Sequence, residues 1–135
     1  MRALGERGFT LIEVLVVCTA LGILSAIAVP KFANSIAVAN TAKLQNDLQT
    51  LDAAIVMYET EHGTYPATLA DLSDYVTDID KLKPPTGKCK LKGGETVEIR
   101  DTVYALKFVR GAEDGTQALE VRAVCDEKTA GAYGR

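Results

Sequence analysis

The sequence has few of the residues from which active sites are built. Its 135 residues include one histidine and no tryptophan. No HExxH zinc motif, P-loop or pairing of cysteine with histidine is present. The one histidine, His62, stands beside the expected end of a helix, where a solvated side chain is the common case. We therefore expect no enzymatic activity, no cofactor and no metal site.

A strong excess of one charge is also missing. The formal net charge is −3, so the chain as a whole is not suited to a polyanionic partner such as nucleic acid. The length allows one domain with an appendage, and not two ordinary domains. Three cysteines permit one disulfide and leave one thiol over.

A long apolar run lies near the start of the chain, in segment 9–29. Its only polar side chains are those of Thr10, Glu13, Thr19 and Ser25. As a helix the run would be ~31 Å long, which matches the hydrocarbon core of a bilayer. Arg2 and Arg7 precede it and Lys31 follows. By the positive-inside rule the N-terminus stays cytoplasmic and the rest of the chain lies outside.

Three ordinary kinds of N-terminus could explain this run. A secretory signal peptide could end at Ala26-Ile27-Ala28, and a plain membrane anchor would need no cleavage. A lipoprotein signal could use Cys18, although Val17 precedes it where a small residue is expected. All three leave the Glu13 carboxylate unexplained, because a charge at mid-membrane costs about 2.5–3.5 kcal/mol on insertion scales.

The run Gly-Phe-Thr-Leu-Ile-Glu, from Gly8 to Glu13, resembles the processing site of type IV pilins and type II secretion pseudopilins. The resemblance implies a leader, residues 1–8, that prepilin peptidase/methyltransferase removes after Gly8. Phe9 would then be the N-methylated first residue. Pro30 also matches, since the family usually has a proline where the membrane part of its first helix ends.

The resemblance gives Glu13 a role in assembly. Cleavage would create a positive amine on Phe9, and a carboxylate in an apolar medium needs such a partner. In the filament that the family builds, the Phe9 amine and the Glu13 carboxylate of neighbouring subunits can meet and set their register. The alternative is an interfacial glutamate that simply reaches the lipid headgroups.

Beyond Pro30 the pattern predicts an amphipathic helix, 31–62, that ends at Gly63. Thr68 and Asp71 form a capping-box pattern that predicts a short helix, 69–76. The apolar stripe of the long helix consists of Leu44, Leu48, Leu51, Ile55 and Tyr58. The charged residues expected on its other faces include Lys43, Asp47, Asp52 and Glu59.

Residues of about 88–125 follow a period of two, which predicts antiparallel strands with turns at Gly93-Gly94 and 111–116. The small sheet must cover the apolar stripe, because it has nothing else to bury against. The expected fold is therefore α+β. A long N-terminal helix, with a membrane half and an amphipathic half, carries an exported head, 30–135, as in pilins.

Strand parity places two of the cysteines on the inward face. Cys89 points the same way as Leu91, and Cys125 the same way as Val121. In an exported head they could form a disulfide across the sheet, or pack as two small buried thiols. Cys18 lies in the membrane segment, where it is most simply a small apolar residue.

The acidic residues do not form a convincing metal site. The spaced acids Asp71, Asp74, Asp78 and Asp80 are typical of a solvated helix and loop. Major pseudopilins of type II secretion carry a calcium site near a Trp-Gly-x-Pro-Tyr-like segment, which this sequence lacks. Glu113, Asp114 and Asp126 are weaker candidate ligands, and a turn explains Asp114-Gly115 equally well.

A run of lysines permits three interpretations. They could protect an exposed edge strand, attract DNA phosphates, or meet the acidic stretch 71–80 of a neighbouring subunit. The run has no interleaved aromatic residues for stacking on single strands, so we expect no nucleic-acid partner. The lysines are Lys81, Lys83, Lys88, Lys90 and Lys92.

The expected function is that of a structural subunit in a pilin-like filament, most simply a type II secretion pseudopilin that supports protein export. The alternative is a type IV or competence pilin used in DNA uptake or adhesion. The resemblance implies an inner-membrane protein with its head outside. Its partners would be prepilin peptidase, an inner-membrane assembly platform, further copies of itself and related pilin-like subunits.

Overall fold

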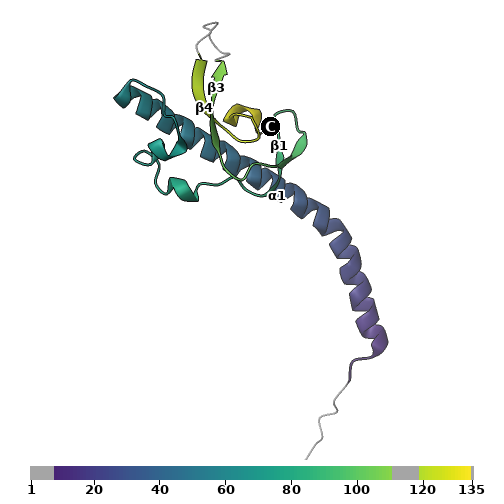
Figure 1. The fold of residues 1–135 in the computed structure, drawn as a ribbon. Coiled ribbons are helices and arrows are strands. Elements are labelled where there is room, and N and C mark those ends of the chain that lie inside the picture. Colours follow the sequence, from purple (N-terminus) through teal and green to yellow (C-terminus); the bar gives the residue numbers. More distant parts are fainter. Residues whose placement is uncertain (1–7, 111–118, 135) are drawn as a thin grey trace, which may run out of the picture. The chain divides into compact units, whose positions relative to one another are not determined.

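The computed structural model describes residues 8–110 and 119–134 and has an α+β fold (Figure 1). Helix α1 spans Leu11–His62, and the strands are β1 (Gly87–Lys90), β2 (Thr96–Ile99), β3 (Ala105–Arg110) and β4 (Leu119–Val124). As expected, α1 is followed by Gly63, which has a φ of 69° and donates its N–H to the Glu59 carbonyl at 2.7 Å. The chain divides into two compact units, Met1–Ser35 and Ile36–Arg135, and we call the second the head unit.

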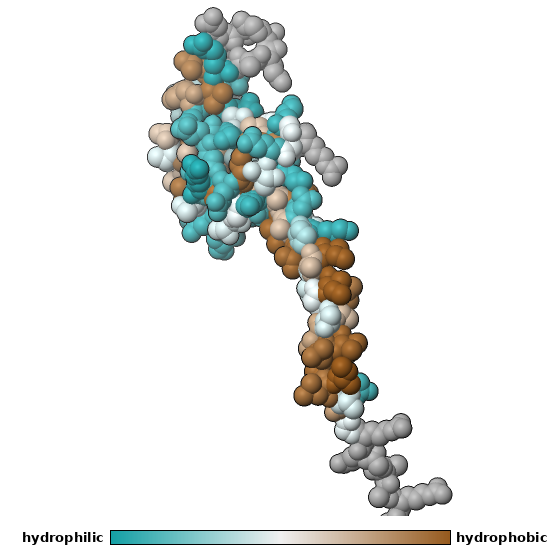
Figure 2. All heavy atoms as spheres, turned by 90° about the vertical axis from the view of Figure 1, so that its right-hand side faces the viewer, coloured by the Kyte–Doolittle hydropathy of each residue, from teal (hydrophilic) through white to brown (hydrophobic). Residues whose placement is uncertain are grey.

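The first unit exposes an apolar helix. Among residues 8–35 none is buried, and Figure 2 shows the hydrophobic side chains of this part of α1 uncovered. Leu15, Val16 and Ile23 are each more than half exposed. The helix is long and apolar enough to cross a membrane, judged by length and composition. Such a surface requires lipid or other protein to cover it.

The core of the head unit forms on the predicted stripe of α1. Leu44, Leu48, Leu51 and Ile55 are at most 1% exposed. They pack with Val121 and Ala123 of β4 and with Leu72 from the connection after α1. The three-and-four spacing therefore identified the buried face of the helix correctly.

The strands form two separate sheets and not the single sheet that the sequence suggested. β1 pairs with β2 and β3 pairs with β4, both antiparallel. After β2, Asp126 accepts the backbone N–H groups of Arg100 and Asp101 at 3.1 and 2.9 Å. These donors are therefore bound by a side chain and do not continue a strand ladder.

The predicted helix 69–76 is shorter and tighter than expected. A 3-10 helix covers Leu69–Leu72, and turns follow it. The predicted role of Asp71 is confirmed, because its carboxylate accepts the Thr68 N–H at 2.8 Å. That backbone hydrogen bond lowers the pKa of Asp71. The buried side chains of Leu72 and Val76 anchor the connection to the core, and short connections of this kind commonly use i to i+3 hydrogen bonds.

The end of the β3–β4 hairpin distant from α1 is more exposed than the alternation of its residues predicted. Phe108 and Leu119 lie on the predicted inward face, yet they are 68% and 60% exposed. The hairpin extends away from α1 (Figure 1), so only its near part, with Val121 and Ala123, reaches the helix. The predicted turn at 111–116 lies outside the described residues.

Candidate functional site

Glu13 is held by its own helix terminus. Its Oε2 atom accepts hydrogen bonds from the backbone N–H and from the hydroxyl of Thr10, both at 2.8 Å. The Thr10 hydroxyl accepts the Glu13 N–H at 3.3 Å in return. This reciprocal pair is a capping box at the start of α1. The Thr-x-x-Glu spacing was visible in the sequence, but Thr10 was not recognised as a partner of the carboxylate.

The capping box satisfies hydrogen bonds but does not neutralise charge. Within residues 8–110 and 119–134, Glu13 takes part in no ion pair. Gly8 and Phe9 precede α1 outside regular structure, and Phe9 is 82% exposed. Pro30, the other predicted assembly residue, lies inside α1. The carboxylate is thus ordered at an accessible end of the apolar helix and still lacks a cationic partner there.

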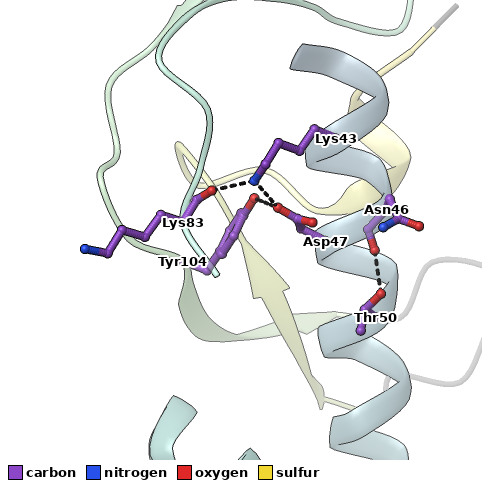
Figure 3. Close-up of polar contacts among 6 residues, drawn as sticks. All are labelled: Lys43, Asn46, Asp47, Thr50, Lys83 and Tyr104. Atoms are coloured by element: carbon purple, nitrogen blue, oxygen red, sulfur yellow. Dashed lines mark hydrogen bonds and ion pairs between the residues drawn. The ribbon is translucent and has the colours of Figure 1, made fainter. Parts of the chain in front are cut away.

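A buried polar network lies in the head unit (Figure 3). Asp47 is 6% exposed, and its carboxylate accepts from the Lys43 ammonium and the Tyr104 hydroxyl, both at 2.7 Å. Lys43 also donates to the Lys83 carbonyl at 2.7 Å. Burial, followed by the hydrogen bond to Asp47, raises the pKa of Tyr104. The network ties α1 to the segment before β1 and to the residue before β3.

Asp47 and Asp52 were expected on faces of the helix other than the apolar stripe, and both bind other parts of the head. Asp52 accepts from Arg122 Nε at 3.0 Å and from the Ala123 N–H at 2.8 Å, so it binds β4 directly. A charged residue that interrupts an apolar stripe suggests solvent exposure. Its partners on strands far along the chain cannot be identified from helical periodicity.

The edge of β1 that faces α1 is covered, which argues against edge protection as the purpose of its lysines. The Asn40 amide donates to the Lys88 carbonyl at 3.0 Å, and the Lys90 N–H donates to the Thr41 hydroxyl at 2.7 Å. The Lys90 carbonyl accepts the Gly134 N–H at 3.1 Å. An edge whose backbone groups are bound in this way cannot template a further strand.

The acidic residues near the C-terminus stabilise a turn. Asp101, Cys125 and Asp126 bring possible ligand atoms within 4.8 Å of one another. The Asp126 carboxylate accepts two backbone N–H groups, and the Asp126 N–H donates to Asp101. These bonds explain the cluster without an ion. Glu113 and Asp114, the other weak candidates, lie outside the described residues.

The two predicted disulfide partners are both in the core. Cys89 and Cys125 are 0% exposed and belong to the same hydrophobic cluster. Both are free thiols in this structure, while Cys18 is exposed on α1. Burial raises the pKa of the Cys125 thiol to about 12 and also raises that of Cys89. The disulfide therefore stays a prediction.

Several curated proteins named type II secretion system core protein G are similar to this chain. The protein of Klebsiella michiganensis is 35% identical over 77 residues, which cover 57% of this chain and 54% of the relative. That of Pseudomonas aeruginosa is 37% identical over 82 residues, covering 61% and 54%. That of Vibrio cholerae is 38% identical over 79 residues, covering 58% and 54%.

The N-terminus also matches a family model, the prokaryotic N-terminal methylation motif, over residues 4–29. These matches support a relationship with the type IV pilin-like family. The matched segment contains Gly8, Phe9 and Glu13 and ends just before Pro30. The chain spans about half the length of the curated relatives that it matches. No solved structure matches it.

The network around Asp47 predicts a measurable loss of stability in Tyr104→Phe. This variant leaves a buried carboxylate without one of its two side-chain donors, so the free energy of unfolding should fall by about 1–2 kcal/mol. Urea unfolding of the head unit, followed by circular dichroism, measures the loss. Thr50→Ala is the control, because the Thr50 hydroxyl is exposed and donates only to Asn46 of its own helix. An equal loss in both variants would contradict the proposed importance of the network.

The buried cysteines predict a specific pattern in exported protein from the native host. Cys89 and Cys125 should be bridged and Cys18 free, and closing ~37 residues should stabilise the head by ~4 kcal/mol in the loop-entropy model. Non-reducing peptide mapping tests the pairing. Recovery of Cys89 and Cys125 as alkylated thiols would refute it. After reduction, folded protein at pH 8 should alkylate slowly at Cys125, since a thiol with a pKa of about 12 stays protonated there.

Proposed function

We propose that this chain is a pseudopilin of a type II secretion system, a structural subunit that polymerises through its N-terminal helix to support protein export. The observation that carries the proposal is the N-terminus itself. An exposed Gly8–Phe9 site is followed by an ordered carboxylate on Glu13 and an uncovered apolar helix. The relatives named for type II secretion favour export over DNA uptake or adhesion.

The first step is processing at the membrane. The apolar part of α1 anchors the precursor as a single span, with the N-terminus on the cytoplasmic side and the head outside. Prepilin peptidase/methyltransferase cleaves between Gly8 and Phe9 and methylates the new amine. Both residues precede α1, so this bond is reached without unwinding the helix. The new positive charge then lies only four residues from Glu13.

The second step is insertion into the filament, in contact with an inner-membrane assembly platform. The exposed side chains of the first unit pack against those of neighbouring subunits, which replace the lipid that covered them. The Phe9 amine of one subunit pairs with the Glu13 carboxylate of another. A subunit inserted out of register would leave a charge unpaired in an apolar interior, which costs several kcal/mol. The ion pair thus selects one axial position.

Processing is tested by the intact mass of the protein from its native host. The expected mass is that of a chain that begins at Phe9 with one added methyl group. Cleavage frees the amine that the Glu13 contact requires, so the uncleaved chain should not assemble. A mature chain that begins at Val29, or at an acylated Cys18, would refute the pseudopilin proposal.

Assembly is tested by two substitutions of Glu13. Glu13→Ala should insert into the membrane and be cleaved, yet yield at least ~10-fold less filament, because the Phe9 amine loses its partner. Glu13→Gln keeps an oxygen that can accept from Thr10 but removes the charge, so it should fail as well. Quantitative immunoblotting of sheared filaments against total protein provides the measurement.

The matched control for this pair is Ser25→Ala. The Ser25 hydroxyl lies in the same apolar segment and donates only to the Leu21 carbonyl of its own helix, at 2.7 Å. Its removal should leave filament yield unchanged. Normal assembly of Glu13→Gln would show that Glu13 acts only as a helix cap, and normal assembly of Glu13→Ala would remove it from the mechanism.

A further inference from the structure

We propose that copies of this chain dock head to tail through two complementary surfaces of the head unit. The first, which we call the lysine face, is the exposed surface of the segment around β1 and includes Lys83, Lys88 and Lys92. The second, the acidic groove, lies between α1 and β4 and carries Glu59 and Glu120. The inference rests on the proposed function, because it describes how heads meet in the filament.

The acidic groove has a volume of about 420 Å³. Asp52, Glu59 and Glu120 contribute carboxylates to its lining, and Arg122 contributes the one guanidinium. Arg122 lies 3.0 Å from Asp52 and 3.6 Å from Glu120, whereas Glu59 has no ion pair within the described residues. The groove therefore carries a net negative charge. Desolvation, then a hydrogen bond to Glu59 and the charges of Glu59 and Glu120, raises the pKa of Tyr65, which also lines the groove.

The floor and rim of this groove are apolar. Ile55 and Val121 form buried parts of its lining, and Val56, which also lines it, is 60% exposed. The Tyr65 ring meets Phe108 edge to face, with centroids 6.2 Å apart. A lysine suits such a site, because its methylene stem packs on apolar surface while its ammonium reaches carboxylates at the rim. The groove thus fits a basic strand better than an anion or a small apolar ligand.

The lysine face supplies the matching charge. Lys83, Lys88 and Lys92 are exposed, and none of them pairs with a carboxylate in the part of the chain that the structure describes. Figure 3 shows the Lys83 ammonium directed away from the Asp47 network, to which this residue contributes only its carbonyl. Because the α1-facing edge of β1 is already covered, its lysines need another explanation than protection of that edge.

The two surfaces cannot meet within one chain. Thr41 holds β1 near the start of the head unit, and Glu59 lies ~27 Å further along α1 at ~1.5 Å per residue. Two different patches that complement each other form a heterologous contact, which generates an open helical assembly when the rotation does not close. A second copy of this chain is therefore the occupant that both surfaces fit.

The acidic stretch 71–80 is less suited to receive the lysines. Asp71 accepts backbone N–H groups of Ala67 and Thr68, and Asp78 lies 3.2 Å from Lys81 of its own chain. Asp74 and Asp80 remain exposed, but neither lines the groove. They offer a matched control for a change of charge elsewhere on the head.

Charge reversal in the full-length protein tests the contact. Glu59→Lys with Glu120→Lys, and separately Lys88→Glu with Lys92→Glu, should each lower filament yield at least ~5-fold. The chain with all four changes should regain most of the wild-type yield, since the charges again complement each other. Asp74→Lys with Asp80→Lys should assemble normally. Membrane insertion and cleavage are checked for every variant, and resistance of the head to limited proteolysis excludes misfolding as the cause.

Three outcomes would overturn the proposal. They are normal yield of either reversal, failure of the four-fold variant to recover, and an equal loss in the Asp74 and Asp80 control. Glu13→Ala separates this inference from the proposed function. If wild-type protein assembles, Glu13→Ala does not, and the reversals have no effect, then only the docking inference is wrong.

Cross-linking offers a second test that does not depend on yield. In a Cys18→Ala background, Lys92→Cys and Glu120→Cys are placed in the same chain and treated with a short bismaleimide. Dimers and higher oligomers should form in the double variant and not in either single variant. Absence of these oligomers from assembled filaments of the double variant would also overturn the proposal.

Discussion

The packing of α1 on the β3–β4 hairpin is the contact on which the head unit depends. Four aliphatic residues of α1, spaced three and four apart, are almost fully excluded from solvent by β4 and the connection after the helix. Small sheets of two strands are marginal by themselves and require such a surface. The same helix begins with a segment that nothing in its own unit covers. The later part of this helix is thus covered by its own chain, and its first part needs an external partner.

Carboxylates then fix the segments that the apolar core leaves free. Asp47 binds Tyr104, Asp52 binds Arg122 and Ala123, and Asp126 binds the chain after β2. Each bond joins residues that are distant in sequence, and the Asp47–Tyr104 bond also satisfies a buried hydroxyl. Apolar side chains can pack in several relative positions, whereas hydrogen bonds to these carboxylates require one geometry. These contacts therefore hold the backbone segments that carry the surface charges used in the proposed docking.

The sequence predicted those features that are set by local spacing. The stripe of α1, its end at Gly63 and the inward direction of Cys89 and Cys125 follow from periodicity and backbone preference, and all three are observed. The buried position of Asp47 was not predicted, because its partner Tyr104 is far along the chain. The alternation of residues along the strand predicted the face on which Phe108 lies. It did not predict that Phe108 is exposed, because alternation does not tell how much of the hairpin α1 covers. The split into two sheets is not visible in the alternation of the strands, because the partners of Arg100 and Asp101 come from Asp126, far along the chain.

The capping box at the start of α1 has a consequence for the contact between subunits. The Glu13 carboxylate already accepts two hydrogen bonds from Thr10 before any neighbour arrives. Pairing with a Phe9 amine would therefore replace or supplement existing bonds, and departure of the neighbour would return the carboxylate to Thr10. In the free subunit the carboxylate therefore stays hydrogen-bonded, although its charge is not neutralised until an amine pairs with it. In the proposed filament, loss of the neighbour would thus restore the bonds to Thr10 and would not leave a carboxylate without any donor.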